Sequence, residues 1–354
     1  MRHGLIATLT VFLLVAPSQA QPVKPSISTN PDFNGKSLDQ WIREIEDPDP
    51  SVREHAIKMI CLMGPAAKRA APALIRQIRQ ENDLSPMTNA IIAIGIVNPD
   101  DPKHQSDAIS ALIPMLGSSQ GIVRFQAATS LASFGPAARK AIERLCARVN
   151  DSQSWEIRRA VCFALGRCGY DESNFPDIRA LEALNKGIDD VSKEVRIEAL
   201  QGLINLGPPK EPQDRQLLKS HFEKRVKVDK DKYAGIWVRV ALMRIDESAI
   251  NDANIKYIAA YLKKTEPLGI NADAARALGA IGPPAKKAIP ELTNALKDKD
   301  VSLVAWSAWA LGRMGPDARQ ALDALKQLLQ DTSDSAIKAA VQEAINAINA
   351  PPKR

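Results

Sequence analysis

Eight aromatic and arginine residues point most directly to a function, because their types and spacing suit a binding surface. They lie at related positions in the second and last thirds of the 354-residue chain. Such side chains dominate the binding free energy of protein interfaces, since they combine large contact areas with hydrogen-bond donors. The residues are Phe163, Arg167, Trp237, Arg244, Arg276, Trp306, Trp309 and Arg313.

Residues that could perform catalysis form no recognisable group. The sequence has no His-Glu-x-x-His metalloprotease helix, no Gly-x-Ser-x-Gly nucleophile elbow and no phosphate-binding loop. We therefore expect no catalytic residue, no metal, no cofactor and no enzymatic activity. The four histidines are far apart in the sequence, at His3, His55, His104 and His221.

The four cysteines allow two interpretations. As small apolar residues they would be buried and reduced in a helical core. In an exported protein they could instead form disulfides. A Cys146–Cys162 bridge is then the best candidate, because Cys162 and Cys168 lie on different faces of one helix. The remaining cysteine is Cys61.

The candidate residues belong to a repeated helical pattern. Apolar or small residues at offsets 0, 4, 8 and 11 recur every 33 to 39 residues, and these offsets share one face of an α-helix. An amphipathic segment separates each stripe from the next, so the repeat predicts stacked pairs of antiparallel helices. The nine stripes begin at Val52, Pro86, Val123, Ile157, Val195, Ala234, Ile270, Leu303 and Ile337.

Each predicted helix stops at a residue that tolerates a left-handed backbone. Gly, Asn or Asp stands twelve residues after each start, and proline follows in six units. These residues commonly end helices, and proline fits the first turn of the next helix. The unit that starts at Ala234 is the most divergent, and we expect it to be distorted. The stops are Gly64, Asn98, Gly135, Gly169, Gly207, Asp246, Gly282, Gly315 and Asn349.

Several segments resemble the HEAT-repeat family, in the bacterial variety with phycobilisome-lyase-like repeats. Residues 49–53, 121–124, 194–196 and 274–283 carry this likeness. The resemblance covers nearly all of residues 37–350. It implies an all-α, right-handed α-solenoid of about nine antiparallel helix pairs, HEAT- or armadillo-like, whose second helices line a concave surface. One HEAT-like enzyme family builds a di-iron centre from His-Glu pairs, and this sequence contains no His-Glu step.

The N-terminus has the pattern of a secretory signal. Arg2 precedes an apolar run from Leu5 to Ala16, which is too short for a typical membrane-spanning helix. We expect a signal peptide over residues 1–20 with cleavage near Ala20, a flexible leader over 21–36, a single solenoid over 37–350 and a tail over 351–354. The mature protein would be a periplasmic or extracellular monomer without a membrane span. Export also disfavours bilin attachment, because pigment assembly is cytosolic.

A recurring arginine allows a functional and a structural interpretation. It follows the first stripe residue in four units, with acidic residues upstream. A ladder of arginines could bind phosphates. We favour the structural role that the HEAT resemblance implies, in which such arginines cross-link adjacent repeats. The four are Arg53, Arg124, Arg158 and Arg196.

Offsets 3, 6 and 10 lie opposite the buried stripe, so their side chains are predicted to be exposed on the concave face. Offset 3 gives Trp237 and Trp306, and offset 10 gives arginines in three repeats. These residues would form a binding groove with one rung per repeat. Alternatively, the large side chains fill gaps where neighbouring helices splay apart.

Three functions remain open. The first is a non-enzymatic scaffold or adaptor that binds a protein or peptide in the cell envelope or outside the cell. The second is binding of a polyanion, nucleic acid or acidic polysaccharide, which export and the modest net charge of +6 disfavour. The third is a lyase-like enzyme, which would gather polar residues in one concave spot rather than in a ladder. The polyanion would bind Arg167, Arg244, Arg276 and Arg313.

Overall fold

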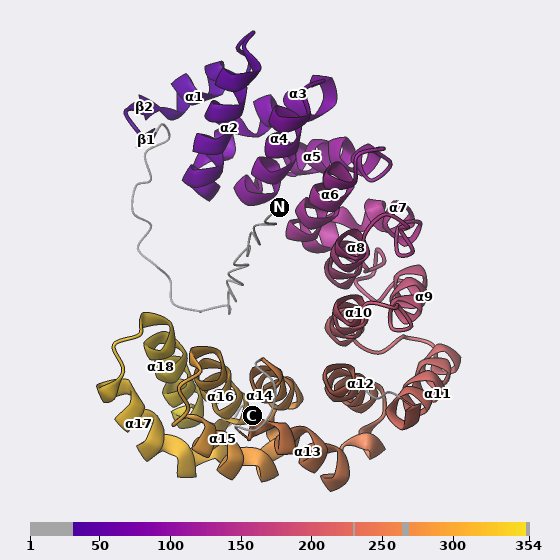
Figure 1. The fold of residues 1–354 in the computed structure, drawn as a ribbon, viewed down its shortest axis with the longest axis vertical. Coiled ribbons are helices and arrows are strands. Elements are labelled where there is room, and N and C mark those ends of the chain that lie inside the picture. The colour runs from indigo at the N-terminus through magenta and orange to yellow at the C-terminus, as the bar shows by residue number, and fades with distance from the viewer. Residues whose placement is uncertain (1–30, 229–230, 264–268, 352–354) are drawn as a thin grey trace, which may run out of the picture.

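Helix pairs form a curved solenoid in the computed structural model, which describes residues 31–228, 231–263 and 269–351 (Figure 1). The predicted all-α solenoid is confirmed, with nine pairs in these ranges. Even-numbered helices line the inner side of the arc, and odd-numbered helices lie outside them. The inner helices are α2 (Pro50–Met63), α4 (Leu84–Val97), α6 (Gly121–Ser133), α8 (Trp155–Cys168), α10 (Lys193–Leu206), α12 (Lys232–Ile245), α14 (Ile270–Ile281), α16 (Val301–Met314) and α18 (Ser335–Asn349). The others are α1 (Leu38–Glu44), α3 (Ala71–Gln80), α5 (Pro102–Met115), α7 (Ile142–Cys146), α9 (Ile178–Gly187), α11 (Pro212–Val228), α13 (Asp252–Ala259), α15 (Ile289–Ala295) and α17 (Leu322–Asp331).

The inner helices begin at polar capping residues and bury the predicted stripe. Asp49, Ser154 and Asp300 accept hydrogen bonds from backbone N–H groups in the first turn of their helices. These donors have no partner inside the helix, so the caps stabilise each start. Stripe residues such as Ala127 and Leu131 of α6 are fully buried. The sequence repeat is therefore the packing seam between neighbouring pairs.

Six of the nine predicted stops have a left-handed backbone. Their φ angles lie between 41° and 84°. Four of the six lead into short 3-10 helices, so the proline after the stop begins a 3-10 turn before the next α-helix. The six are Gly64, Asn98, Gly135, Gly207, Gly282 and Gly315, and the four 3-10 helices are η1 (Gly64–Ala70), η2 (Gly135–Ala141), η5 (Pro283–Ala288) and η6 (Gly315–Ala321).

The left-handed prediction is wrong for Gly169, Asp246 and Asn349. Gly169 has φ −74°, and Asp246 is extended at φ −138°. The Asp246 carboxylate accepts a hydrogen bond from the Ser248 N–H, so this residue caps the start of a 3-10 helix, η3 (Glu247–Ala249). Asn349 still belongs to α18. None of the three has a positive φ angle, so the chain continues past these positions without a left-handed turn.

Glycines allow inner helices to approach each other closely beside the bend. A Cβ on Gly166 of α8 would lie 2.5 Å from the Gly202 Cα on α10. Real Cβ contacts are not that short, so position 166 requires glycine. The close approach places Phe163 and Arg167 of α8 beside the exposed side chains of α10.

Helix α12 lies where the arc turns (Figure 1). It packs less closely against α10 and α14 than most other inner helices pack against their neighbours. Most of its side chains are apolar, and Ile236, Trp237 and Val240 are buried, whereas Arg244 is exposed. Helix α12 lies in the corner between α10 and α14, so it is set back from the concave surface (Figure 1). A further 3-10 helix, η4 (Ala260–Leu262), follows α13.

A two-stranded hairpin precedes the first helix. Antiparallel β1 (Asp32–Phe33) and β2 (Lys36–Ser37) pair, and the Trp41 indole N–H donates to the Phe33 carbonyl at 3.0 Å. The last residues of the expected flexible leader are thus tied to α1. Ser37 is the N-cap of α1, and its N–H donates to Gln40 Oε1 at 2.7 Å. The expected signal peptide, and residues 21–30 of the leader, lie outside the described residues.

Candidate functional site

The concave face contains a cavity where the arc bends. It has a volume of about 560 Å³ and opens among the five inner helices α8, α10, α12, α14 and α16. That volume suits a small ligand or a few residues of a peptide. The lining residues are Arg159, Phe163, Arg167, Glu194, Ile197, Glu198, Gln201, Ile204, Asn205, Trp237, Asp273, Arg276, Ala280, Trp306 and Trp309.

Two tryptophans hold an arginine in this cavity. The Arg276 guanidinium lies 4.6 Å from the centre of the Trp237 ring and 5.6 Å from that of Trp306. Trp306 meets Trp309 edge to face, with ring centres 5.4 Å apart. Trp309 lies over α14 where Gly279 leaves room, because a Cβ there would be 2.3 Å from its Cζ3 atom. Stacking on aromatic rings orients a planar guanidinium, so Arg276 is fixed in place.

Positive and negative side chains balance in the cavity. Arg159 pairs with Glu198 at 3.1 Å. Burial raises the pKa of the Glu198 carboxyl, although Arg159 opposes the rise. With three arginines facing three carboxylates, the cavity has little net attraction for a polyanion. The charged residues are Arg159, Arg167, Arg276, Glu194, Glu198 and Asp273.

Arg276 and Asp273 present hydrogen-bonding groups that the described chain does not use. Arg276 Nη1 and Asp273 Oδ1 are 4.0 Å apart, which exceeds a hydrogen bond. Neither side chain forms a hydrogen bond with any described residue. Burial raises the pKa of the Asp273 carboxyl and lowers that of the Arg276 guanidinium, since both lose hydration. The Trp237 indole N–H is also buried without an acceptor among the described residues.

Six of the eight predicted concave-face residues line this cavity. Arg313 lies beside it, with its guanidinium 5.9 Å from the Trp309 ring. Arg244 is exposed at the end of α12 and is not part of the lining. The predicted exposure is wrong for Trp237, which is 2% exposed because α12 is set back. The six are Phe163, Arg167, Trp237, Arg276, Trp306 and Trp309.

Sequence reasoning missed the residues that α10 contributes. Glu198, Gln201 and Asn205 occupy offsets 3, 6 and 10 of the fifth repeat. They therefore share the register of the predicted tryptophans and arginines, which could have identified them. Arg159 and Glu194 lie outside those offsets, and no sequence signal marks them.

Equivalent positions in the first repeats carry different side chains. Leu62 and Ile96 occupy offset 10 and are 67% and 44% exposed. In α4 and α6, the residues at offsets 3, 6 and 10 carry no charge. The concave face therefore carries uncharged rungs on α4 and α6 and continues into the charged aromatic cavity. These α4 and α6 residues are Asn89, Ile92, Ile96, Gln126, Thr129 and Ser133.

The four repeat arginines form ion pairs between neighbouring repeats. The Arg124–Asp151 pair is the most buried, with side chains 5% and 3% exposed and a distance of 2.8 Å. Burial is the strongest single influence and would raise the pKa of Asp151, but hydrogen bonds from Arg124 and from the Gln153 N–H, together with the nearby arginine charges, hold that pKa below its usual value. None of these arginines lines the cavity. The other pairs are Arg53–Glu81 at 2.8 Å, Arg158–Asp190 at 2.6 Å and Arg196–Asp231 at 2.8 Å.

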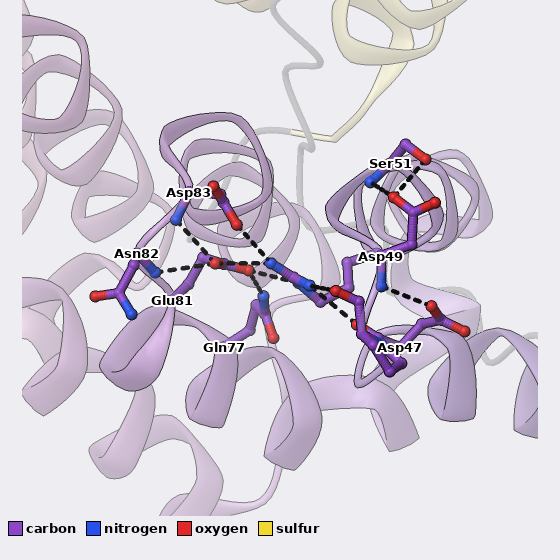
Figure 2. Close-up of polar contacts among 9 residues, drawn as sticks. Asp47, Asp49, Ser51, Gln77, Glu81, Asn82 and Asp83 are labelled. Atoms are coloured by element: carbon purple, nitrogen blue, oxygen red, sulfur yellow. Dashed lines mark hydrogen bonds and ion pairs between the residues drawn. The ribbon is translucent and has the colours of Figure 1, made fainter.

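The first of these junctions gathers carboxylates and carbonyls from two repeats. Figure 2 shows Glu81 and Asp83 on one side of this junction and Asp47 on the other, with the Asp47 carboxylate turned toward the Asp49 N–H. Arg53 donates to the Asp47 carbonyl at 2.9 Å and to the Asp83 carboxylate at 2.8 Å. Its hydrogen bonds with Glu81 raise the pKa of its guanidinium. Such contacts fix one repeat against the next.

The cysteines are reduced, and Cys162 and Cys168 are fully buried. Burial raises the pKa of Cys61 and of Cys146 to about 11, so both thiols are protonated at neutral pH. The Cys146–Cys162 bridge is not formed. Within residues 31–228, 231–263 and 269–351, no three His, Cys, Asp or Glu side chains are placed to hold a metal ion.

The family model for HEAT repeats matches residues 38–132, 89–166, 142–234 and 255–346. The chain belongs to the HEAT-repeat family. These HEAT repeats account for the helix pairs and for the packing stripe of the inner helices. None of the described helices is long and apolar enough to cross a membrane.

Solved structures with similar folds are distant in sequence. An engineered protein is 19% identical, with 88% of each chain covered and a TM-score of 0.49. The complex of CpcE and CpcF of phycocyanin lyase from Nostoc sp. PCC7120 is 19% identical, covering 92% of this chain and 100% of that one, with a TM-score of 0.47. A structure from work on the interaction between cadherin and beta-catenin is 17% identical, covering 88% and 69%, with a TM-score of 0.45. No curated protein matches the chain.

Proposed function

We propose that this HEAT-repeat protein binds a protein or peptide along its concave face, with the cavity between α8 and α16 as the main contact. One observation carries the proposal. Partly exposed Trp306, Trp309 and Arg276 meet in a single concave cavity. Buried clusters of tryptophan and arginine supply most of the affinity of protein interfaces. A solenoid also offers an extended surface on which a partner chain can lie.

Polyanion binding has weaker support. The cavity holds as many carboxylates as arginines. Arg276 stacks on two tryptophans beside Asp273, so it offers little charge to a phosphate or sulfate. Arg167, Arg244 and Arg313 remain exposed, but they are spread over α8, α12 and α16. A neutral or charge-balanced partner suits this face better.

An enzymatic role has one observation in its favour. Polar side chains gather in one spot, as a lyase-like enzyme would require, and Glu198 is a buried carboxyl with a raised pKa. Such carboxyls serve as general acids in many enzymes. However, Glu198 is ion-paired with Arg159, and the described lining contains no Ser, Thr, Cys, His, Lys or Tyr that could act as a nucleophile. We therefore propose binding without catalysis.

The partner would be met after export. The apolar run near the N-terminus and the Ser-Gln-Ala at residues 18–20 support secretion of a mature chain that starts near Gln21. In the periplasm or outside the cell, the protein would act as a scaffold or adaptor.

Capture of a partner by the mature protein, residues 21–354, tests this function. Wild-type protein and a Trp306→Ala, Arg167→Ala double variant would be immobilised and exposed to envelope extracts. Trp155→Ala is the matched control, because Trp155 is exposed on α8 outside the cavity lining. We expect wild type and control to retain the same partner and the double variant to lose it, with similar melting temperatures for all three. Equal retention by the double variant would contradict the proposal.

A further inference from the structure

We propose that the cavity recognises the primary amide of an asparagine or glutamine side chain of the partner, with Arg276 donating to the amide oxygen and Asp273 accepting from the amide NH₂. This inference rests on the proposed function. It begins from a cation and an anion, 4.0 Å apart in one cavity, that donate and accept no hydrogen bond within the described chain.

The geometry of amides selects the primary amide. Its carbonyl oxygen and one of its N–H groups point to the same edge, so one side chain can contact a neighbouring donor and acceptor together. A trans peptide unit presents its C=O and N–H on opposite edges. The main chain of a peptide therefore cannot contact Arg276 and Asp273 through the same amide.

The charges select a neutral group. A ligand carboxylate would pair with Arg276 but would be repelled by Asp273. A ligand ammonium group would pair with Asp273 but would be repelled by Arg276. Glu198 adds a further negative charge that acts on Arg276. A primary amide satisfies both members of the pair without adding charge. The Arg276 and Asp273 side chains are 29% and 25% exposed, so the amide would replace water, and hydrogen bonds to charged groups are stronger than those between neutral groups.

The surrounding side chains provide the rest of the binding site. Trp306, Trp309 and Phe163 form apolar walls that suit the methylene groups of glutamine and a neighbouring apolar residue. Because Arg276 is held between indole rings, little side-chain freedom is lost when the amide binds.

Selection from a phage-displayed library of random 12-residue peptides on the mature protein tests the inference. We expect the selected peptides to share an Asn or Gln beside an apolar residue. In a synthetic copy of a selected peptide, replacing that Gln by Glu or by Met should weaken binding roughly tenfold or more, the effect of one lost hydrogen bond to a charged group. Asp273→Asn should remove the preference for Gln over Glu, because the repelling carboxylate is gone. Arg276→Lys should weaken binding of the Gln peptide, because an ammonium group does not reproduce the guanidinium geometry, whereas Trp155→Ala should keep both affinity and preference.

The outcomes separate the inference from the proposed function. Selected peptides that share an acidic residue, or whose affinity ignores the Gln replacement, would overturn amide recognition and leave peptide binding intact. Failure to select any peptide would contradict both. The replacements in the peptide leave the protein unchanged, so a folding defect in the variants cannot imitate the predicted result.

Discussion

The two ends of the concave face carry different chemistry on the same scaffold. In the first three repeats, the rungs include exposed Leu62 and Ile96, and those of α4 and α6 carry no charge. In the fourth to eighth repeats, the same offsets supply Phe163, Arg276 and Trp306 to a cavity. The buried stripe remains apolar or small in both parts. The core therefore constrains one face of each inner helix, while the opposite face is free to specify a partner.

The cavity also depends on helix α12, which departs from the regular packing of the other inner helices. Helix α12 is set back at the bend, so α10 and α14 stand on either side of it. Trp237 then forms the base of a cavity instead of a rung on the surface. A hollow of about 390 Å³ between α6 and the start of α8 has no tryptophan or arginine in its lining. The position of α12 at the bend therefore creates the cavity, which a regular row of inner helices would lack.

Loss of Arg124 should have the largest effect of the changes considered, because it leaves Asp151 buried without its cation. Breaking a buried ion pair from one side costs about 3–5 kcal/mol. Arg196→Met should cost less, since the Arg196–Asp231 pair is 15% and 19% exposed, against 5% and 3% for Arg124–Asp151. Denaturant unfolding of Arg124→Met and Arg196→Met at pH 7 measures both. Equal losses of unfolding free energy in the two variants would show that the cost of breaking a junction does not depend on its burial.

The same pair makes stability depend on pH. The pKa of Asp151 is lowered in the folded protein, so its contribution is present above the unfolded value of about 3.9. The contribution is lost as the pH falls through the folded pKa. The difference in unfolding free energy between wild type and Arg124→Met should therefore shrink below about pH 4. A difference that stays constant from pH 7 to pH 3 would contradict this.

Gly279→Ala should disturb the cavity specifically. The new Cβ would lie 2.3 Å from Trp309 Cζ3 and 2.9 Å from the Ala310 Cα, and overpacking of this kind costs about 1–3 kcal/mol. Gly95→Ala is its N-terminal counterpart, since its Cβ would meet Ser130 at 2.8 Å. Both changes should lower the melting temperature, but only Gly279→Ala should alter tryptophan fluorescence in the folded state. Identical emission spectra would mean that Trp309 does not rest on Gly279.

Salt should affect partner binding only slightly. The cavity has equal numbers of cationic and anionic side chains, so few counterions are released when it is filled. The logarithm of the affinity should be nearly independent of the logarithm of the salt concentration between about 50 and 200 mM. Isothermal titration at several salt concentrations provides the measurement. A steep loss of affinity would favour the polyanion alternative.

Ile96→Arg should have the smallest effect on stability. Ile96 is 44% exposed at the offset that holds arginine in repeats four, six and eight, and exposed substitutions usually change stability by less than about 0.5 kcal/mol. Denaturant unfolding of this variant measures how freely the N-terminal rungs can vary. A cost of about 2 kcal/mol or more would place Ile96 in the packing seam instead.

The packing of the solenoid could be predicted from sequence because it repeats. Residues such as Val123, Ala127 and Leu131 return at fixed offsets, and all three are buried on helix α6 as the stripe predicts. The backbone conformation at the stops Gly169 and Asp246 could not be predicted from the repeat. Gly and Asp tolerate several backbone conformations, and the surrounding chain decides which one they adopt.

The cavity was only partly predictable. The register identifies Trp306 and Trp309, and it also marks Glu198 and Gln201 at the same offsets. It could not reveal that α12 is set back, because that position depends on packing between whole helices. For the same reason, the stacking of Arg276 on Trp237 appears only in three dimensions.

The five tryptophans can report directly whether a peptide binds in the cavity between α8 and α16. Trp237, Trp306 and Trp309 line the cavity, whereas Trp41 and Trp155 do not. The measurement is a titration of ¹⁵N-tryptophan-labelled mature protein with a selected peptide, followed by the indole N–H resonances, which are assigned by single substitutions. We expect the signals of Trp237, Trp306 and Trp309 to shift together while those of Trp41 and Trp155 stay unchanged. Binding that shifts only Trp41 or Trp155, or none of the five, would contradict this expectation.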